Sequence, residues 1–351
     1  MLSIAEQGRG DLLSLEQEHV IAVDSILIIV SPGNPVDALT MDQAGRIFSG
    51  EITNWAEVGG PDTPISVYTR SEASGTRGVF TGQVLRPIEA EMAADAVVVG
   101  GNREMADKVV ADAGGIGYVG FASLRDAKPL DLVAQCGIKM KATTFGAKTE
   151  EYPLERRLRL FVDNRPLPDM AGELIAFAES SAADGLVRKA GFIDLGVEVA
   201  SAGLDRDRLM EAALASEDAV ALRLLRTMML ELGEAERLST TFRFNPGSVE
   251  LDNKAQRDVS RVIEFLARPE HAGRELVFVG FTDADGSFQA NAALSEGRAA
   301  VAMEAVRNHP DFAKLSGFRM RALGFGELAP VGCNETFDGR KRNRRVELWL
   351  N

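Results

Sequence analysis

A stretch with helical periodicity, from about Ser201 to Arg237, separates two regions in which strand-like and helix-like segments alternate. Apolar residues recur there at helical spacing without a strand candidate, so we expect one or two helices whose Leu and Met stripe packs against a core. The chain has 351 residues, more than one hydrophobic core usually accommodates. The sequence therefore predicts two domains, over residues 1–200 and 239–351, joined by a helical linker over 201–238.

The first region is predicted to be an α/β domain, because strands and helices alternate along it. Strands are expected at Val20–Val30, Ile65–Thr69, Val97–Val99 and Ile116–Val119. Thr40 and Gln43 have the spacing of a capping box, and the helix that they open should end near Ser49. A second helix is expected over Thr76–Leu85, since Pro87 disfavours its continuation.

The last region is predicted to be an α+β domain with the order β-α-β-α-β-β. The expected elements are strand Thr240–Phe244, helix Asp252–Ala267, strand Glu275–Phe281, helix Leu294–Asn308, and strands Phe318–Gly324 and Arg345–Leu350. Asp252 is a suitable N-cap for the first helix, whose apolar residues form one face.

The charge of the chain is unevenly distributed. It carries 39 Lys and Arg residues against 52 Asp and Glu, a net charge of −13, yet the segment from Ser239 onward is near neutral, at +1, and the first 238 residues carry −14. Because nucleic-acid binding relies on a basic surface, we expect no nucleic-acid partner. His19, His271 and His309 are isolated, and no Cys/His cluster has metal-ligand spacing. We therefore predict no metal site and no cofactor.

The stretch Thr69–Arg77 has the chemistry of an anion site. A strand ends there, hydroxyl residues flank Gly75, and a helix begins. Amides at a helix N-terminus carry partial positive charge and bind anions without a basic surface. Ser74 and Thr76 add hydroxyl donors, and Arg70 offers a guanidinium fork to a tetrahedral oxyanion. The competing interpretation, which the local sequence favours, is that Ser74 is simply the cap of the helix.

Several ordered motifs between about residues 10 and 198 resemble the PstS-type phosphate-binding family of periplasmic substrate-binding proteins. The motifs are Leu39–Val58, Gly59-Gly60-Pro61, the loop Arg70…Ser74-Gly75-Thr76-Arg77, Gly114–Val119 and Tyr152–Arg156. The resemblance implies a type II periplasmic-binding-protein fold, with two lobes, a hinge and phosphate buried between the lobes. It assigns Arg70, Ser74, Gly75 and Thr76 as the phosphate contacts of one lobe.

The same resemblance implies that the first lobe is incomplete. In the family this lobe opens with a strand and with glycine- and serine-rich loops that supply the remaining phosphate contacts, and Met1 lies after them. Either the true start lies upstream of Met1, or the protein keeps only half of the phosphate site, which cannot exclude water from both sides of a ligand. The longest early apolar run, Val20–Val30, is too short to cross a membrane and follows no basic segment. No export signal is expected within the chain.

A carboxylate and an arginine are placed to meet in the last region. Asp283 follows the predicted strand Glu275–Phe281, and Arg298 lies on the next helix. This strand–loop–helix path can bring the two side chains together, where they would complement a ligand that bears both an ammonium and a carboxylate group. An ordinary Asp–Arg salt bridge beside a solvated loop is an equally weighted alternative.

The motifs of residues 239–351 resemble those of the OmpA-like peptidoglycan-binding domain. They are Phe242-Arg243-Phe244, Gly280–Gly286, Asn291…Leu294-Ser295…Arg298-Ala299, Gly324–Pro330 and Gly339–Glu347. That family binds the diaminopimelate of the cell-wall stem peptide without a covalent bond. The resemblance implies that Asp283 holds the amine and Arg298 the carboxylate. Asn291 and Leu294 would shape the pocket, and Arg344 would add to it.

Together the two resemblances predict a binding protein of the periplasm and cell envelope rather than an enzyme. The OmpA-like domain would grip the peptidoglycan stem peptide and the PstS-like domain would bind phosphate or a similar oxyanion, with an ABC transporter permease as a further candidate partner. The alternative is a structural or interaction protein whose N-terminal domain no longer binds phosphate. A hydrolase that uses Ser74 as its nucleophile is disfavoured, because no His or Lys base lies near it in the sequence.

Overall fold

The computed structural model describes residues 14–351 apart from 16, 163–165, 201–209, 211–218, 246–247 and 316. The chain divides into two compact units. The first unit comprises Ala22–Leu158 and Gly185–Asp194, and the second comprises Met1–Ile21, Arg159–Asp184 and Leu195–Asn351. Within the described ranges, no helix combines the length and the apolar character needed to cross a membrane.

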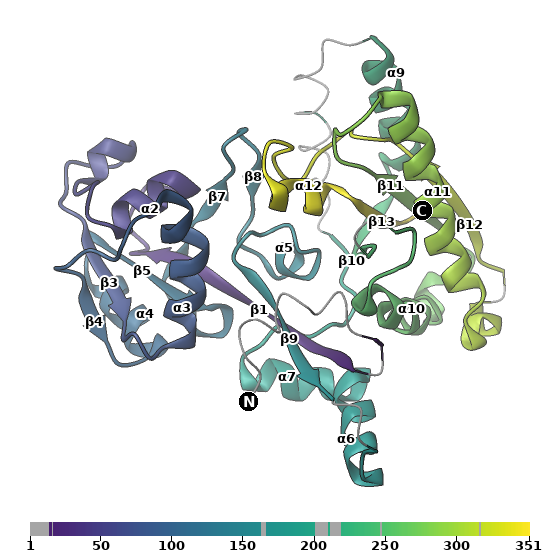
Figure 1. Cartoon of the computed structure of the whole chain (residues 1–351), viewed down its shortest axis with the longest axis horizontal. Helices are drawn as coiled ribbons and strands as arrows, with labels where there is room; N and C mark the ends of the chain where they lie inside the picture. The colour runs from purple at the N-terminus through teal and green to yellow at the C-terminus, as the bar shows by residue number, and fades with distance from the viewer. Residues whose placement is uncertain are drawn as a thin grey trace. The chain divides into compact units, whose positions relative to one another are not determined.

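The first unit contains a mixed sheet with the strand order β4-β3-β5-β1-β6, and β9 also pairs with β1 (Figure 1). The strands are β1 (Glu18–Val30), β3 (Ser66–Arg70), β4 (Val97–Val99), β5 (Gly115–Gly120), β6 (Lys128–Pro129) and β9 (Glu155–Phe161), of which β1 and β9 cross the unit boundary. β1 runs antiparallel to β5, whereas β3 runs parallel to both β4 and β5. Residues 22–30 of β1 are all buried, which confirms the prediction of a buried strand.

Helices and a smaller sheet complete the first unit. The small sheet has the order β2 (Ala38–Thr40), β7 (Asp131–Val133) and β8 (Lys139–Met140). The α-helices are α2 (Met41–Phe48), α3 (Gly75–Phe80), α4 (Asn102–Ala111), α5 (Thr144–Lys148) and, across the unit boundary, α7 (Asp184–Ala190). Shorter turns are η2 (Trp55–Val58), η3 (Thr81–Leu85), η4 (Arg86–Ile88) and η5 (Phe121–Ser123).

Two local predictions for this unit are confirmed. The Thr40 hydroxyl accepts a hydrogen bond from the Gln43 amide at 3.0 Å, and the Gln43 side chain accepts one from the Thr40 amide at 2.9 Å, so the capping box is formed. The helix expected over Thr76–Leu85 is also present, although its second half, η3, is a π-helix.

The second unit is built on a four-stranded sheet with the order β10-β13-β11-β12, in which β11 is parallel to β12 and antiparallel to β13. Its strands are β10 (Glu236–Phe242), β11 (Glu275–Phe281), β12 (Arg319–Gly324) and β13 (Arg345–Leu350). Helices α10 (Asn253–Leu266) and α11 (Phe288–Arg307) pack on one face with Leu276 and Phe278 (Figure 1). Helix α9 (Ala219–Leu232) packs on the other face with Val277 and Val279.

The Leu and Met stripe of α9 is packing surface, as predicted, since Leu225, Met228 and Leu232 are buried against the sheet. Leu222 of that stripe is 39% exposed, and its earlier members, Leu204, Leu209, Ala212 and Ala213, lie outside the described residues. The apolar face predicted for α10 is likewise buried, and its N-cap is Asp252, whose carboxylate accepts from the Ala255 amide at 2.8 Å.

Three predictions for the last region are corrected. The first strand begins at Glu236 rather than Thr240, because it pairs with β13 from that residue. Helix α11 begins at Phe288 rather than Leu294, since Ser287 caps it by accepting from the Ala290 amide at 3.3 Å. Helix α12 (Phe337–Asn343) was not predicted, so the order is β-α-β-α-β-α-β. The short turns η7 (Pro269–His271) and η8 (Pro310–Leu315) complete the region.

The polar side of α10 contacts residues from earlier in the chain that belong to the same unit, including α6 (Asp169–Glu179) and η6 (Ser181–Ala183). Arg261 pairs with Asp184 at 3.1 Å and donates to the Glu179 carbonyl oxygen at 2.7 Å. Asn253 donates to the Glu18 carboxylate at 2.8 Å. Helix α10 therefore joins these earlier segments to the C-terminal sheet.

His271 is expected to make the stability of the second unit depend on pH. Its ring is buried and stacks on Phe265, with centroids 4.2 Å apart. Desolvation lowers the pKa of His271 below 6.5; Arg274 and Arg268 lower it further, and Glu270 and Glu236 act in the opposite direction. Between the lowered pKa and about 6.5 the unfolded chain binds more protons than the folded chain, so stability should rise with pH.

This rise can be measured by urea unfolding between pH 5 and 7. The chain has two tryptophans, and in a Trp55→Phe background the fluorescence reports on Trp349 of the second unit alone. We expect His271→Phe to flatten the pH dependence. An NMR titration that places the pKa of His271 at or above 6.5 would contradict the prediction.

Candidate functional site

The carboxyl end of β11 positions Asp283 in the second unit. The strand ends at Phe281, and the following loop returns into α11 through Gly286, whose φ of +102° suits glycine. Asp283 is only 8% exposed, and one of its carboxylate oxygens accepts the Asp285 amide at 3.3 Å. The loop therefore fixes a carboxylate that has little access to solvent.

Helix α11 brings Arg298 to the same unit with a guanidinium that is incompletely hydrogen-bonded. Asn291, Ser295 and Arg298 are buried at spacings of three and four residues, and so share one face of the helix. Arg298 is 8% exposed and its guanidinium lies 5.3 Å from the centroid of the Phe244 ring. Its Nε and Nη1 atoms are buried without a hydrogen-bond partner among the described residues. Such unpaired donors are costly and rare in folded proteins.

The charge of this arginine is partly desolvated. Burial lowers the pKa of the Arg298 guanidinium, the neighbouring Arg344 lowers it further, and Asp283 acts in the opposite direction. The group nevertheless stays protonated at neutral pH, because an arginine pKa lies far above 7. A buried cation with two free N–H donors is suited to receive a carboxylate.

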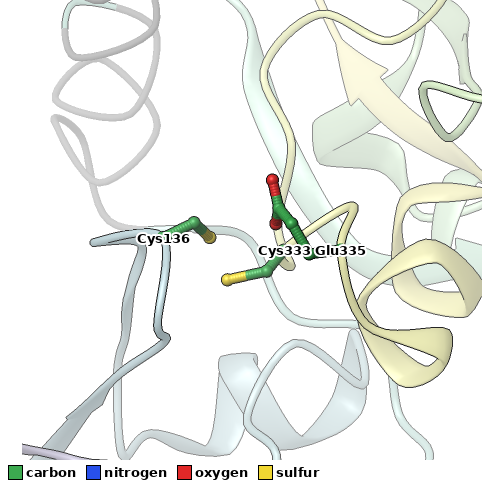
Figure 2. Close-up of side chains that lie close together, drawn as sticks. All are labelled: Cys136, Cys333 and Glu335. Atoms are coloured by element: carbon green, nitrogen blue, oxygen red, sulfur yellow. The ribbon is translucent and has the colours of Figure 1, made fainter.

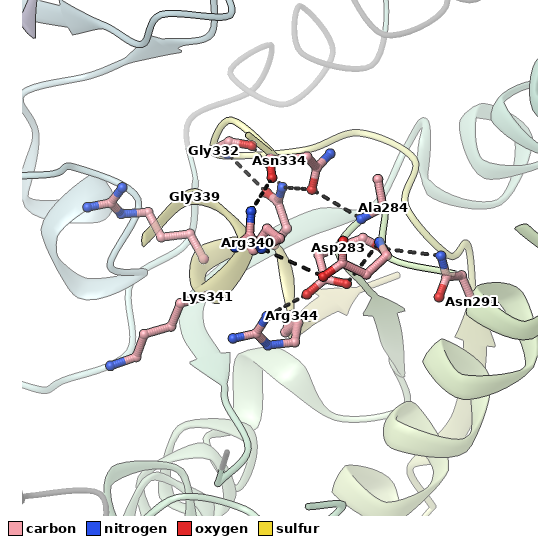
Figure 3. A network of polar contacts seen from close by, with 12 residues as sticks. Asp283, Ala284, Asn291, Gly332, Asn334, Gly339, Arg340, Lys341 and Arg344 are labelled. Carbon is pink, nitrogen blue, oxygen red and sulfur yellow. Dashed lines mark hydrogen bonds and ion pairs between the residues drawn. The ribbon is translucent and has the colours of Figure 1, made fainter. Parts of the chain in front are cut away.

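Arg344, rather than Arg298, is the ion-pair partner of Asp283. A guanidinium nitrogen of Arg344 contacts the second carboxylate oxygen of Asp283 (Figure 3). No Asp283–Arg298 pair occurs among the ion pairs of the described residues, so the alternative of an ordinary salt bridge between those two residues is wrong.

The other predicted residues of this site lie on α11. The Asn291 side chain donates to the Asp283 carbonyl oxygen at 3.3 Å and to the Glu327 carboxylate at 2.6 Å. It therefore ties the loop after β11 to the loop after β12. Leu294 is 41% exposed, which makes it the least buried of the predicted residues.

Sequence reasoning missed the residues that hold α12 beside Asp283. The Asn343 amide accepts from the Val331 and Gly332 amides at 2.9 and 3.0 Å and donates to Asn334 at 2.9 Å. Asn334 in turn accepts from the Ala284 amide at 3.2 Å, next to Asp283 (Figure 3). The sequence signal that could have pointed to this network is the single asparagine within the basic run Arg342-Asn343-Arg344-Arg345.

The loop that carries Asn334 packs closely against α12. It also carries Cys333, which is buried, and Glu335, which is exposed (Figure 2). A Cβ atom on Gly339 would lie 2.0 Å from the Cys333 carbonyl oxygen. Glycine is therefore needed at 339 for this loop and Arg344 to keep their places.

The predicted anion loop of the first unit joins the end of β3 to α3. The Ser74 hydroxyl accepts from the Arg77 amide at 3.4 Å, so the capping role of Ser74 is confirmed. The Gly75 and Thr76 amides donate no hydrogen bond within the described part of the first unit. These two amides at the start of the helix remain available to an anion.

Arg70 is held beside this loop by the next strand–helix turn. One terminal nitrogen of its guanidinium donates to the Asn102 side chain, and the other donates to the Gly100 carbonyl oxygen at 3.1 Å. The nearby buried Asp24 is paired with Arg156 at 2.7 Å, so its charge is balanced. The backbone carbonyl oxygen of Arg70 accepts from the Arg77 guanidinium of α3 at 2.9 Å, whereas part of the Arg70 guanidinium is already bonded to the turn after β4.

Comparison with known proteins gives two separate matches. A model of the PBP superfamily domain matches residues 11–183, and a model of the OmpA family matches residues 243–344. The phosphate-binding protein PstS of Borreliella burgdorferi is 27% identical over 186 residues, which are 51% of this chain and 66% of that protein. Outer membrane porin F of Pseudomonas aeruginosa is 28% identical over 116 residues, 33% of this chain and 32% of that protein.

A solved structure is also similar: an ABC-type phosphate transport receptor from Vibrio cholerae has 28% identity and a TM-score of 0.45, over 55% of this chain and 76% of that one. The chain thus spans only part of each of these relatives. The predicted fold class is confirmed. The chain joins a PBP superfamily domain that resembles phosphate-binding proteins to a C-terminal OmpA family domain.

Proposed function

We propose that this chain is a binding protein of the bacterial cell envelope that is anchored to peptidoglycan by its OmpA family domain. Asp283 would hold the free ammonium of diaminopimelate in the stem peptide, and Arg298 its carboxylate. The PBP superfamily domain would bind phosphate or a similar oxyanion. No reaction is part of the proposal.

The observation that supports the wall-binding role is that the buried guanidinium of Arg298 has unpaired N–H donors. Its two unpaired, buried N–H groups are a cost to the folded protein, and a ligand carboxylate that accepts from one of them would relieve part of that cost in a charge-assisted hydrogen bond. The buried carboxylate of Asp283, which influences the pKa of Arg298, supplies the opposite charge. A zwitterionic group with an ammonium and a carboxylate on one carbon matches this pair.

Co-sedimentation with purified sacculi tests this role. The full chain should pellet with sacculi whose stem peptides contain diaminopimelate, and free meso-diaminopimelate should release it. Sacculi with lysine at that position lack the carboxylate that Arg298 would bind, and should retain little protein. Equal retention by both kinds of sacculi would contradict the assignment of Arg298.

For the first unit, the proposal rests on the two available amides at Gly75 and Thr76 and on the guanidinium of Arg70, the last residue of the strand before this loop. These groups suit an anion even on an acidic domain, because they act at short range. Titration calorimetry with inorganic phosphate tests it, with sulfate as the matched anion. Phosphate is expected to give a heat of binding, and both Thr76→Val and Arg70→Gln should reduce it. An absence of phosphate binding would count against the oxyanion role.

A second candidate function for the first unit is docking of a protein partner without phosphate, an ABC transporter permease being one candidate. The observation in its favour is that Arg70 already donates to Asn102 and Gly100, so part of its hydrogen-bonding capacity is used within the protein. If phosphate gives no heat while sacculi still retain the chain, this candidate replaces the oxyanion role.

A further inference from the structure

The ion pair between Arg344 and Asp283 occupies the atoms that a ligand ammonium would need. One oxygen of Asp283 accepts the Asp285 amide, and the other is paired with Arg344. The Asp283 side chain is only 11% exposed, which leaves little space for a further cation. An ammonium that binds Asp283 must therefore compete with the Arg344 guanidinium.

Arg344 is the member of this pair that can move. Its side chain is 33% exposed, three times the exposure of Asp283. It follows the last residue of α12 with an irregular backbone conformation, φ −72° and ψ 86°, and so lies outside the regular helix. Asp283, by contrast, is held by the loop that Asn291 and Asn334 fix.

The charges of the site also point to an exchange. The positive charge of Arg344 lowers the pKa of Arg298, and the carboxylate of Asp283 acts on Arg298 in the opposite direction while it pairs with Arg344. Both cations thus bear on Asp283, while the other carboxylate of the site, Glu327, accepts from Asn291 at 2.6 Å. Release of Arg344 toward solvent removes one of the two cations.

We propose that Arg344 is an internal competitor for the ligand's ammonium group: a diamino-acid side chain displaces it from Asp283, while the ligand carboxylate binds Arg298. This inference rests on the proposed wall-binding function and adds a specificity device to it. Small cations without a carboxylate would gain too little from Asp283 alone to displace Arg344. Only a ligand that also binds Arg298 would complete the exchange.

The proposal is tested by whether removal of the Arg344 charge raises or lowers the affinity for meso-diaminopimelate. Binding of meso-diaminopimelate to the full chain is measured by calorimetry, and Arg344→Gln should tighten it by about two- to fivefold, the range expected for loss of a partly exposed competing pair. The matched control Arg307→Gln removes an exposed arginine of α11 that pairs with Glu304, and should leave the affinity unchanged.

A second ligand separates competition from direct contact. Pimelate has the same chain length and both carboxylates but no amine, so it has nothing to gain at Asp283, and Arg344→Gln should not tighten its binding. Weaker or equal binding of meso-diaminopimelate to Arg344→Gln overturns the proposal while leaving wall binding intact. If neither the wild-type chain nor any variant binds meso-diaminopimelate or sacculi, the proposed function itself has failed.

Discussion

Replacing Arg298 with methionine is expected to abolish peptidoglycan binding without lowering the stability of the protein. The guanidinium is buried with two unpaired N–H donors, so its removal relieves a desolvation cost that Phe244 and Asp283 offset only in part. Methionine keeps most of the side-chain length and can still pack against Phe244. Loss of the contact between this cation and the ligand carboxylate should cost about 2 kcal/mol or more, or roughly 30-fold in affinity.

Two measurements on the same variant check this prediction. Sedimentation with diaminopimelate-containing sacculi should show the loss of binding, and thermal unfolding should show an equal or higher Tm. Arg307→Met, on the exposed side of the same helix, is the control and should change neither quantity. A marked fall in the Tm of Arg298→Met would mean that the arginine serves the fold, and retained binding would remove it from the site.

Replacing Glu347 with glutamine is expected to destabilise the second unit strongly. Glu347 is fully buried, and one carboxylate oxygen pairs with Arg345 at 2.7 Å and with Arg237 at 3.3 Å. The other oxygen accepts from the Trp349 indole at 3.1 Å. The substitution leaves two buried cations without their shared counter-charge, which costs about 3–5 kcal/mol. That is a large part of the roughly 5–15 kcal/mol that stabilises a folded domain.

Urea unfolding in the Trp55→Phe background measures this loss, because Trp349 contacts Glu347 directly. The control is Glu304→Gln, which removes an exposed carboxylate paired with Arg307 and should change the free energy of unfolding by less than about 0.5 kcal/mol. If Glu347→Gln unfolds at the same urea concentration as the parent, the buried charges do not depend on this carboxylate.

Elements with a strong local signal could be predicted from the sequence. The capping box of Thr40 and Gln43 and the N-cap Asp252 both satisfy helix amides within three residues, so their physics is contained in the local sequence. The predicted start of α11 at Leu294 is wrong, because Ser287 caps the helix and its first turn lies before Leu294.

The Arg345–Glu347–Arg237 cluster could not be predicted in the same way. In β13 the polar residues Arg345 and Glu347 alternate with apolar ones, a pattern that normally indicates one solvent-exposed face. All six residues of the strand are nonetheless buried, because α9 covers that face of the sheet. The burial depends on residues more than a hundred positions away, which no local pattern records.

In the candidate site, too, local features could be predicted from the sequence and long-range contacts could not. Asp283 and Arg298 were predicted from a strand, a loop and a helix that follow one another in the sequence. The pairing of Asp283 with Arg344, and the asparagines that fix α12 beside it, connect segments that are fifty to sixty residues apart. These contacts exist only once the sheet is assembled, and they change Arg344 from an added contact into a competitor for the same carboxylate.

The central claim is that Asp283 and Arg298 together hold the diaminopimelate of a stem peptide. The most direct measurement is an NMR titration of the isotope-labelled full chain with a soluble muropeptide that contains meso-diaminopimelate. The account predicts saturable shifts of the Asp283, Ala284 and Asn291 amides and of the Arg298 Nε–H, with the amides of the first unit unchanged. Saturable binding that leaves these four signals in place and moves residues elsewhere would contradict it.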